Sequence, residues 1–299
     1  MEYIKVSKAA EKWGISTRRV RVLCAEGKID GVVRKGNLYM IPENATKPMD
    51  GRMNRSAFLT LIESKKEKLS SMRPLTPGEV ERLAEEFMID FTYNSNAIEG
   101  NTLTLKETAL ALEGMTIDQK PLKDHLEAVG HRDAFLYVQD VAKGEQPISE
   151  YVIKNIHSLV LMNRPEDKGV YRRIPVHIMG AYTEPVQPYL IEPKMNELLI
   201  ENEARKAIMT TVERIAHFHL EFEGVHPFID GNGRTGRLIL NLELIREGFP
   251  PINVKFTDRK RYYDAFDAFY RDGDAGKMID LIAEYVNKRL DEYLEVLGQ

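Results

Sequence analysis

The sequence predicts a mainly α-helical protein, an all-α bundle with a small β-hairpin, preceded by a small winged helix-turn-helix domain. Three observations support this fold class. Apolar residues recur with helical spacing in many segments beyond residue 76, one short segment has the composition of a strand, and the first 48 residues carry a separate pattern. The chain has 299 residues, of which 43% are hydrophobic and 29% are charged, so it has enough apolar material for a sizeable core.

Composition excludes several classes of protein. The apolar runs are too short for a transmembrane helix, and residues 1–5 lack the apolar core of a signal peptide. The single cysteine, Cys24, cannot form an intrachain disulfide and is expected to be a small core side chain. No cysteine and histidine spacing is typical of a zinc site. We therefore expect a cytoplasmic protein that has no membrane partner.

The charge changes sign along the chain. Residues 1–55 contain 12 basic and 6 acidic side chains, a net charge of +6, whereas the other 244 residues carry −10. The stretch 42–51 has two prolines, a glycine and no apolar period, which is typical of a linker. We therefore expect a first domain over 1–48, a linker over 49–55 and a second domain over 56–299.

The first domain has the signals of two short helices. Ser7 is expected to cap a helix over 8–13, and Ser16 is expected to cap a second helix over 17–26. Gly14 permits a tight turn between them. The apolar residues of both segments are spaced so that the helices share a small core, which is a helix-turn-helix pattern.

A short hairpin, or wing, is predicted over 32–41, after the second helix. The second helix carries Arg18, Arg19 and Arg21, whose guanidinium groups suit phosphates and guanine edges. The combination resembles the small winged helices of the MerR and excisionase type, which implies duplex DNA as a partner and a homodimer as the binding form. The alternative is that the three arginines are a solvated helix face.

The second domain is predicted to be helical almost throughout. Two capping boxes, Thr76 with Glu79 and Thr104 with Glu107, mark the starts of two helices. The expected helices cover 77–99, 105–112, 121–143, 149–163, 194–222, 234–247, 258–271 and 275–297. The one strand-like segment, 173–179, contains Pro175 and is expected to be an edge strand or hairpin.

The most informative stretch is H-P-F-I-D-G-N-G-R-T-G-R at 226–237, which joins two segments of helical period. Glycines at 231 and 233 let backbone N–H groups point inward, and the following helix adds its free N–H groups. Arg234 and Arg237 lie on one side of its first turn, so the stretch predicts a cradle for several phosphates. Asp230 suits Mg²⁺ shared with phosphates, and His226 suits a general base.

Three other interpretations of this stretch are disfavoured. The glycine spacing also matches a dinucleotide fingerprint, but that fingerprint needs a preceding strand. A metal site of His217, His219 and His226 is disfavoured because the first two lie two positions apart on a helix and face different ways. A purely structural turn does not require two arginines, an acid, an asparagine and a histidine.

Every fixed position of 226–237 matches the motif H-P-F-x-[DE]-G-N-G-R-x-x-R, and the chain resembles the Fic (filamentation induced by cAMP) family over roughly 56–299. The resemblance implies an all-α bundle that transfers AMP from ATP, with Mg²⁺, to a hydroxyl side chain of a target protein. Some relatives use other nucleotides, transfer other phosphate-containing groups or remove AMP.

The resemblance also implies a role for each motif residue. His226 would deprotonate the target hydroxyl, Asp230 would hold Mg²⁺, and Phe228 would anchor the loop in the core. Asn232 and the amides of Gly231 and Gly233 would hold the α-phosphate, Arg234 would contact the β-phosphate and Arg237 the γ-phosphate. The full implied nucleotide set within the motif is Gly231, Asn232, Gly233, Arg234, Thr235, Gly236 and Arg237.

Two further segments resemble parts of the same family. Residues 169–188 resemble the flap, a hairpin whose backbone pairs with the target and which brings Met179, Gly180, Ala181 and Tyr182 near the nucleotide. Downstream, 258–263 resembles the segment that flanks adenine, so Tyr262 and Tyr263 are candidate nucleotide contacts. Tyr270 stands where some relatives have asparagine, which affects recognition of the base or ribose.

The stretch S-N-A-I-E-G at 95–100 resembles the inhibitory motif [ST]-x-x-x-E-[GN], with Ser95 and Glu99 at its fixed positions. Arg237 can pair with Glu99 or with the γ-phosphate, but hardly with both. A helix C-terminus disfavours an acid, which supports a special partner for Glu99. The sequence therefore favours a self-inhibited AMP-transferase. The alternatives are a DNA-binding regulator with a nucleotide-sensing domain, and an enzyme that removes AMP.

Overall fold

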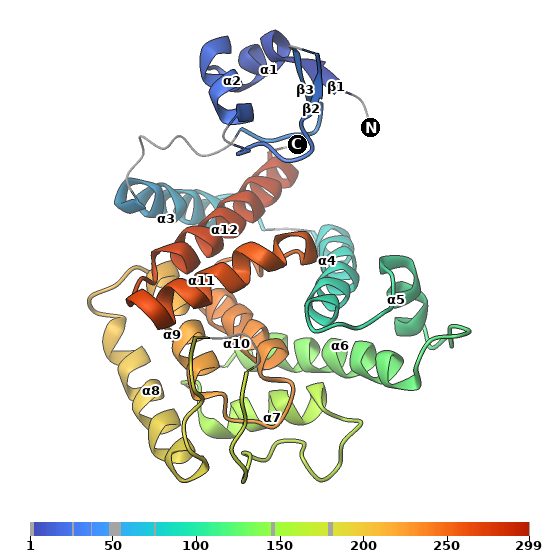
Figure 1. The fold of residues 1–299 in the computed structure, drawn as a ribbon, viewed down its shortest axis with the longest axis vertical. Coiled ribbons are helices and arrows are strands. Elements are labelled where there is room, and N and C mark those ends of the chain that lie inside the picture. Colours follow the sequence, from blue (N-terminus) through green and yellow to red (C-terminus); the bar gives the residue numbers. More distant parts are fainter. Residues whose placement is uncertain are drawn as a thin grey trace. The chain divides into compact units, whose positions relative to one another are not determined.

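The computed structural model describes residues 3–25, 27–36, 38–47, 55–74, 76–144, 147–178 and 182–298. The chain folds as two compact units, residues 1–57 and residues 58–299, and each is described by itself (Figure 1). Of the predicted linker, residues 49–54 lie outside the described residues. Within those ranges no helix is long and apolar enough to cross a membrane.

The first unit combines two helices with a three-stranded antiparallel sheet. Helices α1 (Val6–Trp13) and α2 (Thr17–Ala25) are followed by strands β2 (Val33–Lys35) and β3 (Leu38–Pro42), and β1 (Tyr3–Lys5) completes the sheet in the order β1-β3-β2. The helices and the hairpin lie where the sequence predicts them, whereas β1 was not predicted. The buried core comprises Ile4, Ala9, Ala10, Trp13, Val20, Leu23, Cys24, Ile29 and Ile41.

The capping signals of this unit are only partly correct. Ser16 accepts a hydrogen bond from the Arg19 amide at 3.2 Å and therefore caps α2 as predicted. The prediction for Ser7 is wrong, because α1 already begins at Val6 and the preceding Lys5 provides no side-chain cap. Gly14 ends α1 with a φ of 63°, the left-handed conformation that glycine adopts without strain.

The second unit is a bundle of helices (Figure 1). In chain order they are α3 (Arg55–Ser71), α4 (Pro77–Ile98), α5 (Leu105–Leu112), α6 (Leu122–Ala142), α7 (Glu150–Val160), α8 (Ile191–Arg205), α9 (Thr211–Val225), α10 (Asn232–Arg246), α11 (Arg259–Asp272) and α12 (Gly276–Leu297). Single 3-10 turns at Pro188–Leu190 and Phe256–Asp258 precede α8 and α11. Both predicted capping boxes are present, at the starts of α4 and α5.

Helices α9 and α10 form the centre of this unit. One apolar cluster joins Val212 and Leu244 to α11 and α12, and a second joins Phe222 and Leu238 to α6 and α7. A helix that is apolar on several faces is stable only when neighbours cover it on each side. The packing therefore holds the α9–α10 pair rigidly, and with it the loop that joins the two helices.

The predicted helix over 194–222 is wrong, because two helices occupy this range. Helix α8 ends at Arg205 and α9 begins after Thr210. The Thr210 side chain accepts a hydrogen bond from the Glu213 amide, and the Glu213 carboxylate accepts one from the Thr210 amide. This capping box starts a new helix although no glycine or proline interrupts the apolar pattern.

The flap is also different from the predicted β-hairpin. No strand is formed within 169–178 or 182–188, the described parts of this segment. Prolines 175, 185 and 188 have no N–H to donate to a strand partner. The two arms are joined by a side chain instead, because the Arg172 guanidinium donates to the carbonyls of Ile174 and Val186.

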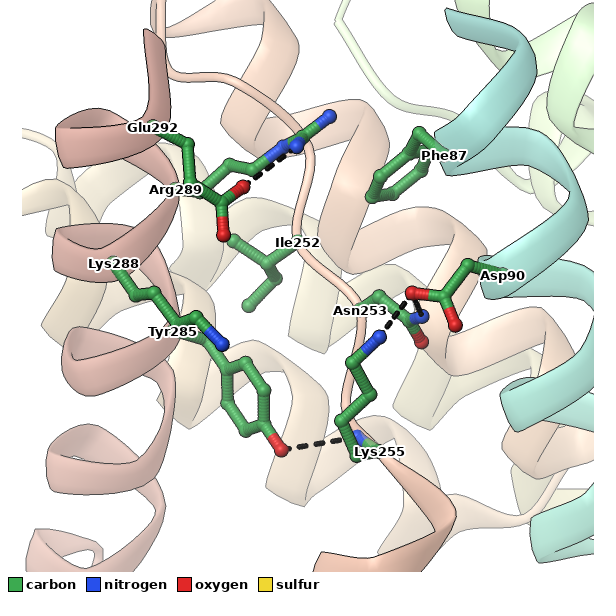
Figure 2. Close-up of a pocket in the computed structure, with 9 residues that line it drawn as sticks. All are labelled: Phe87, Asp90, Ile252, Asn253, Lys255, Tyr285, Lys288, Arg289 and Glu292. Atoms are coloured by element: carbon green, nitrogen blue, oxygen red, sulfur yellow. Dashed lines mark hydrogen bonds and ion pairs between the residues drawn. The ribbon is translucent and has the colours of Figure 1, made fainter. Parts of the chain in front are cut away.

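A small cavity of about 90 Å³ lies between α4, α12 and the segment that precedes α11 (Figure 2). On its α4 side, the Asp90 carboxylate pairs with Lys255 and accepts a hydrogen bond from Asn253 at 3.0 Å. On its α12 side, the Tyr285 hydroxyl accepts one from the Lys255 amide at 3.0 Å. These contacts hold α4 against the 252–255 segment. None of the residues that line the cavity belongs to the predicted site.

Candidate active site

The 226–237 motif forms the junction of the two central helices. Helix α9 ends at Val225, and its C-cap, His226, has φ 50° and ψ 61°. Helix α10 begins after Gly231, which has φ 76°. A left-handed conformation costs a residue other than glycine roughly 1–2 kcal/mol. Since a helix precedes the glycine-rich loop, the dinucleotide interpretation does not apply. The strained backbone of His226 persists because surrounding contacts hold it.

The loop after His226 is anchored in the core. Phe228 is completely buried, as predicted, and its ring stacks on His157 with a centroid distance of 3.6 Å. Asn232 donates to the Phe228 carbonyl and accepts from the Phe228 amide, both at 2.9 Å. Asn232 therefore closes the loop with its side chain, and its contact with an α-phosphate remains a prediction.

His157 on α7 holds the loop through hydrogen bonds at both of its ring nitrogens. The Gly169 amide donates to its Nδ1 at 2.8 Å, and its Nε2 lies 2.9 Å from the Asp230 carbonyl oxygen. This pairing assigns the proton to Nε2, because Nδ1 acts as the acceptor. Burial lowers the pKa of His157 to about 4, which keeps the ring neutral.

The N-terminus of α10 has no side-chain cap, so its first amides are not satisfied by the motif itself. Asp230, which is one-third exposed, lies beside it and accepts a hydrogen bond from the Gly231 amide at 2.7 Å. Free amides and the positive end of the helix dipole favour a bound anion.

Arg237 is 2% exposed and is held by the end of α4. Its Nε donates to the Ser95 hydroxyl at 3.0 Å, and one terminal nitrogen donates to the Ser95 carbonyl at 2.8 Å and to the Glu99 carboxylate at 2.7 Å. A Cβ atom on Gly233 would lie 2.3 Å from Glu99 Oε1. The Glu99 carboxylate thus lies directly against the first turn of α10.

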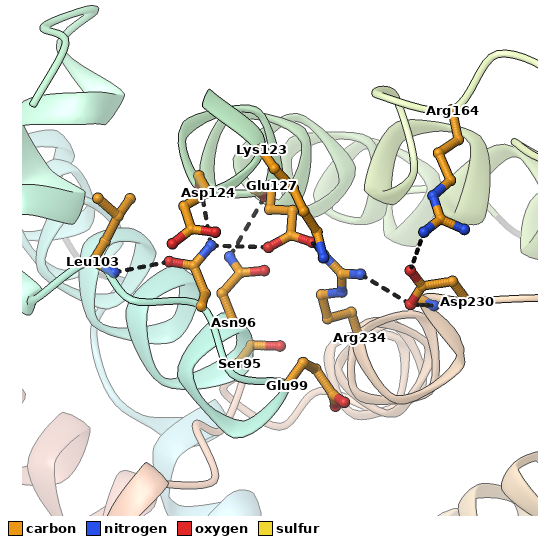
Figure 3. Close-up of polar contacts among 12 residues, drawn as sticks. Ser95, Asn96, Glu99, Leu103, Lys123, Asp124, Glu127, Arg164, Asp230 and Arg234 are labelled. Atoms are coloured by element: carbon orange, nitrogen blue, oxygen red, sulfur yellow. Dashed lines mark hydrogen bonds and ion pairs between the residues drawn. The ribbon is translucent and has the colours of Figure 1, made fainter. Parts of the chain in front are cut away.

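Arg234 is as buried as Arg237, but its charged partners differ from those of Arg237 (Figure 3). Its guanidinium lies 3.1 Å from the Glu127 carboxylate on α6 and 3.5 Å from Asp230. Arg164 lies on the other side of Asp230, at 3.6 Å. Glu127 also accepts a hydrogen bond from Asn101, two residues after Glu99, at 3.0 Å. The two motif arginines are therefore held by different acids: Arg237 by Glu99, directly after α4, and Arg234 by Glu127 on α6 and by Asp230.

His226 has a largely buried side chain that is 20% exposed. Burial first, and then the positive charge of Arg172, lower the pKa of His226 to about 4. The Glu223 carboxylate lies 3.9 Å from Nδ1, and burial followed by the charge of Glu99 raises the pKa of Glu223 to about 8. The imidazole is therefore neutral at physiological pH and available as a base.

Two other predicted nucleotide contacts, Tyr262 and Thr235, are buried in the core. Tyr262 is 1% exposed, and its hydroxyl lies 2.7 Å from His219 Nε2 and 3.5 Å from Arg237, so its ring lies in the core. A contact between Tyr262 and a nucleotide stays a prediction. Thr235 is completely buried, and a Cβ on Gly236 would meet Glu223 and His219. These two positions serve the packing of α10 on α9.

Tyr263 and Tyr182, two further candidates, lie nearer the surface. Tyr263 is 38% exposed with Arg259 over its ring, and Tyr182 is 62% exposed with Arg271 over its ring. Tyr270 donates to the Leu220 carbonyl at 2.7 Å. Met179, Gly180 and Ala181 lie outside the described residues.

Sequence reasoning missed three residues of the site: Arg172, His157 and Glu127. Arg172 donates to the carbonyl of His226 at 2.8 Å, His157 holds the loop, and Glu127 holds Arg234. All three lie far from the motif in the sequence. Only Arg172 had a signal, because it belongs to the 169–173 stretch that was recognised as part of the flap.

Residues 147–244, which include α7 to α9, the motif and most of α10, match the Fic/DOC family. The chain also resembles a solved Fic domain containing signaling protein from Bacteroides thetaiotaomicron, with a TM-score of 0.72 and 27% identity over 81% of this chain and 98% of that chain.

A Fic/DOC domain therefore spans residues 147–244 of this chain.

Two other Fic proteins extend this relationship. Fic-1 from C. elegans has 28% identity and a TM-score of 0.73 over 82% of this chain and 73% of that chain. The protein adenylyltransferase Fic of Nematostella vectensis is 34% identical over 244 residues, which are 79% of this chain and 56% of that protein. The chain spans about half the length of the curated relatives it matches.

Proposed function

We propose that this Fic protein is a self-inhibited AMP-transferase, which moves AMP from ATP to a hydroxyl side chain of a target protein with the help of Mg²⁺. The observation that supports this most is the position of a neutral, buried histidine beside an uncapped helix N-terminus that carries two arginines. The names of its curated relatives, protein adenylyltransferases, support the same activity.

The chemistry assigns one task to each group. The neutral imidazole of His226 takes the proton of the target hydroxyl, whose oxygen then attacks the α-phosphorus of ATP. The bond from the α-phosphorus to the bridging oxygen breaks, and pyrophosphate leaves. The amides at the start of α10, with Arg234 and Arg237, hold the phosphates and offset their charge, which is most of what phosphoryl-type transfer requires.

Asp230 is the residue that would hold Mg²⁺. Its carboxylate is accessible and lies at the N-terminus of α10, where phosphates would bind. Among the residues that the structure describes, no three acidic, histidine or cysteine side chains gather as a metal site. That fits a Mg²⁺ ion bound through one carboxylate and substrate phosphates, which neutralises the charge of the phosphates.

Self-inhibition follows from competition for Arg237. While Glu99 pairs with Arg237 and lies against Gly233, the guanidinium is not available to a γ-phosphate. ATP would then bind without its third phosphate aligned, and transfer would be slow. Loss of the Glu99 carboxylate frees the arginine.

We expect the purified protein to become labelled from ATP that carries the label at the α-phosphate, and the Glu99→Gly variant to become labelled faster. The reason is that AMP retains the α-phosphorus, whereas pyrophosphate carries away the others. Intact mass measured with each nucleotide triphosphate identifies the group transferred and the preferred nucleotide.

Label from the γ-phosphate would identify a phosphotransferase instead. The absence of any transfer to itself or to added protein, by either form, would favour a nucleotide sensor. Release of AMP from a modified protein by the wild type would favour AMP removal, in which Glu99 aligns a water molecule.

We further propose that the first unit binds duplex DNA. Arg18 and Arg21 are exposed on α2 at positions three apart, and Arg34 and Lys35 are exposed on β2 of the wing. Two basic surfaces on a recognition helix and a wing suit a DNA groove and its phosphates. One such module makes few base contacts, which favours a homodimer that binds two half-sites.

Replacement of Arg18 and Arg21 by alanine is expected to weaken DNA binding without changing AMP transfer. Each lost phosphate contact should reduce the slope of log K against log salt by roughly 0.9. Anisotropy titrations of the full chain measure both the DNA affinity and its salt dependence. They use DNA from upstream of its own coding region and random duplex. If neither duplex binds at any salt concentration, the unit instead contacts another protein.

A further inference from the structure

Arg172 makes five hydrogen bonds that converge on the catalytic loop and the flap. Its Nε donates to the carbonyl of His226 at 2.8 Å, and its guanidinium also reaches the carbonyls of Val225, Ile174 and Val186. Its own amide donates to the Pro227 carbonyl at 2.9 Å. Three consecutive carbonyls, at 225, 226 and 227, are therefore bound by this one residue.

The position of these carbonyls matters because His226 is one of two residues other than glycine with positive φ in the described part of the chain. The left-handed turn at His226 directs the carbonyls of Val225 and His226 toward Arg172, where one side chain binds both. A backbone in this conformation keeps its shape only when its polar groups are held. Arg172 provides that restraint from outside the motif.

Arg172 is 5% exposed, and within the described residues no carboxylate pairs with it. Its charge is offset by carbonyl oxygens, two of which belong to the C-terminal end of α9, the negative end of the helix dipole. A buried cation without a paired acid acts strongly on nearby titratable groups, because little solvent screens it.

We propose that Arg172 is the positioning residue of the catalytic base: its guanidinium fixes the left-handed backbone of His226 and joins both arms of the flap to it. The inference rests on the proposed function, in which His226 is the base. Arg172 acts through His226 and needs no contact with ATP or with the target.

The charges around His226 act in opposite directions. The carboxylates of Glu99 at the end of α4 and Asp230 in the loop favour the imidazolium, as does the backbone carbonyl of Glu223 on α9. Burial and then the charge of Arg172 oppose them. The Glu223 side chain adds little negative charge, because its own pKa is raised to about 8. If Arg172 is replaced by an apolar side chain, burial still lowers the pKa of His226, but the opposing positive charge is lost. The pKa of His226 should then move from about 4 toward the ordinary value of about 6.5.

The test uses the full chain carrying Glu99→Gly, with and without Arg172→Met. We expect the kcat of transfer to fall by about 100-fold, as for a misplaced catalytic group, while the KM for ATP changes less than about threefold. Nuclear magnetic resonance of labelled histidines measures the pKa of His226 directly, with His226→Gln to assign its signal. The matched control is Arg173→Met, which removes the neighbouring exposed arginine and should leave that pKa unchanged.

A second variant separates the two effects and serves if Arg172→Met does not fold. Arg172→Lys keeps the charge but not the planar fork, so kcat should fall while the pKa of His226 stays low. A folded Arg172→Met protein with unchanged kcat and unchanged His226 pKa would overturn the proposal, as would Arg172→Lys with unchanged kcat. If no variant transfers AMP, the proposed function fails, and the histidine titration still decides the role of Arg172.

Discussion

Replacement of His226 by alanine is expected to lower AMP transfer by about 10²–10⁴-fold while ATP affinity stays within about threefold of the parent. In the proposed mechanism the imidazole acts on the target hydroxyl, whereas the start of α10 and its arginines hold the phosphates. Single-turnover transfer and calorimetric ATP binding, both measured in the Glu99→Gly background, separate the two quantities. Near-parental transfer by the alanine variant would refute the role of His226.

A matched control exists on the same helix. His217 is partly exposed on α9 and lies 3.9 Å from Glu221, outside the proposed site, so His217→Ala should leave transfer unchanged. The pH profile gives a second check. Because the pKa of His226 lies near 4, the neutral base is present above about pH 5, and kcat/KM should fall only as the pH drops through that pKa.

Replacement of Glu99 by glycine is expected to raise transfer by about 10- to 100-fold. The freed guanidinium of Arg237 can then bind a phosphate, and a hydrogen bond to a charged group contributes about 1.5–3 kcal/mol, which corresponds to that factor. Arg237→Ala alone should weaken productive ATP binding. The double variant should lose most of the gain, because the two residues are coupled through one contact.

Glu113 provides a closely matched control for this experiment. It is an exposed glutamate at the C-cap of α5 and is followed by glycine, as Glu99 is at the C-cap of α4. Glu113→Gly makes the same chemical change at the same helix position, and transfer should stay at the wild-type rate. A double variant of Glu99 and Arg237 as active as Glu99→Gly would contradict the competition for Arg237.

The sequence predicted those parts of the fold whose signals are local. The capping boxes at Thr76 and Thr104 and the apolar period gave most helices, and the same kind of box at Thr210 was overlooked because the apolar pattern continued through it. Helix α3 was not predicted, since its buried residues, Phe58, Leu59 and Ile62, occupy only its first half.

The site shows the same division between local and distant signals. The motif itself, and the pairing of Glu99 with Arg237, follow from recognisable residue patterns, and the pairing is present in the structure. The environment of a side chain is set by elements distant in sequence, as for Arg234, which is held by Glu127 on α6. Neighbouring positions on one helix also diverge: Tyr262 faces the core and Tyr263 does not.

The ion pair between Glu99 and Arg237 joins two residues of one chain within one compact unit. Their encounter is therefore governed by an effective concentration that the fold sets, not by how many molecules are in solution. Dilution does not weaken such a contact, and crowding by further copies does not strengthen it. A cell that holds a few copies of this protein and a cell that holds thousands would restrain each copy to the same degree.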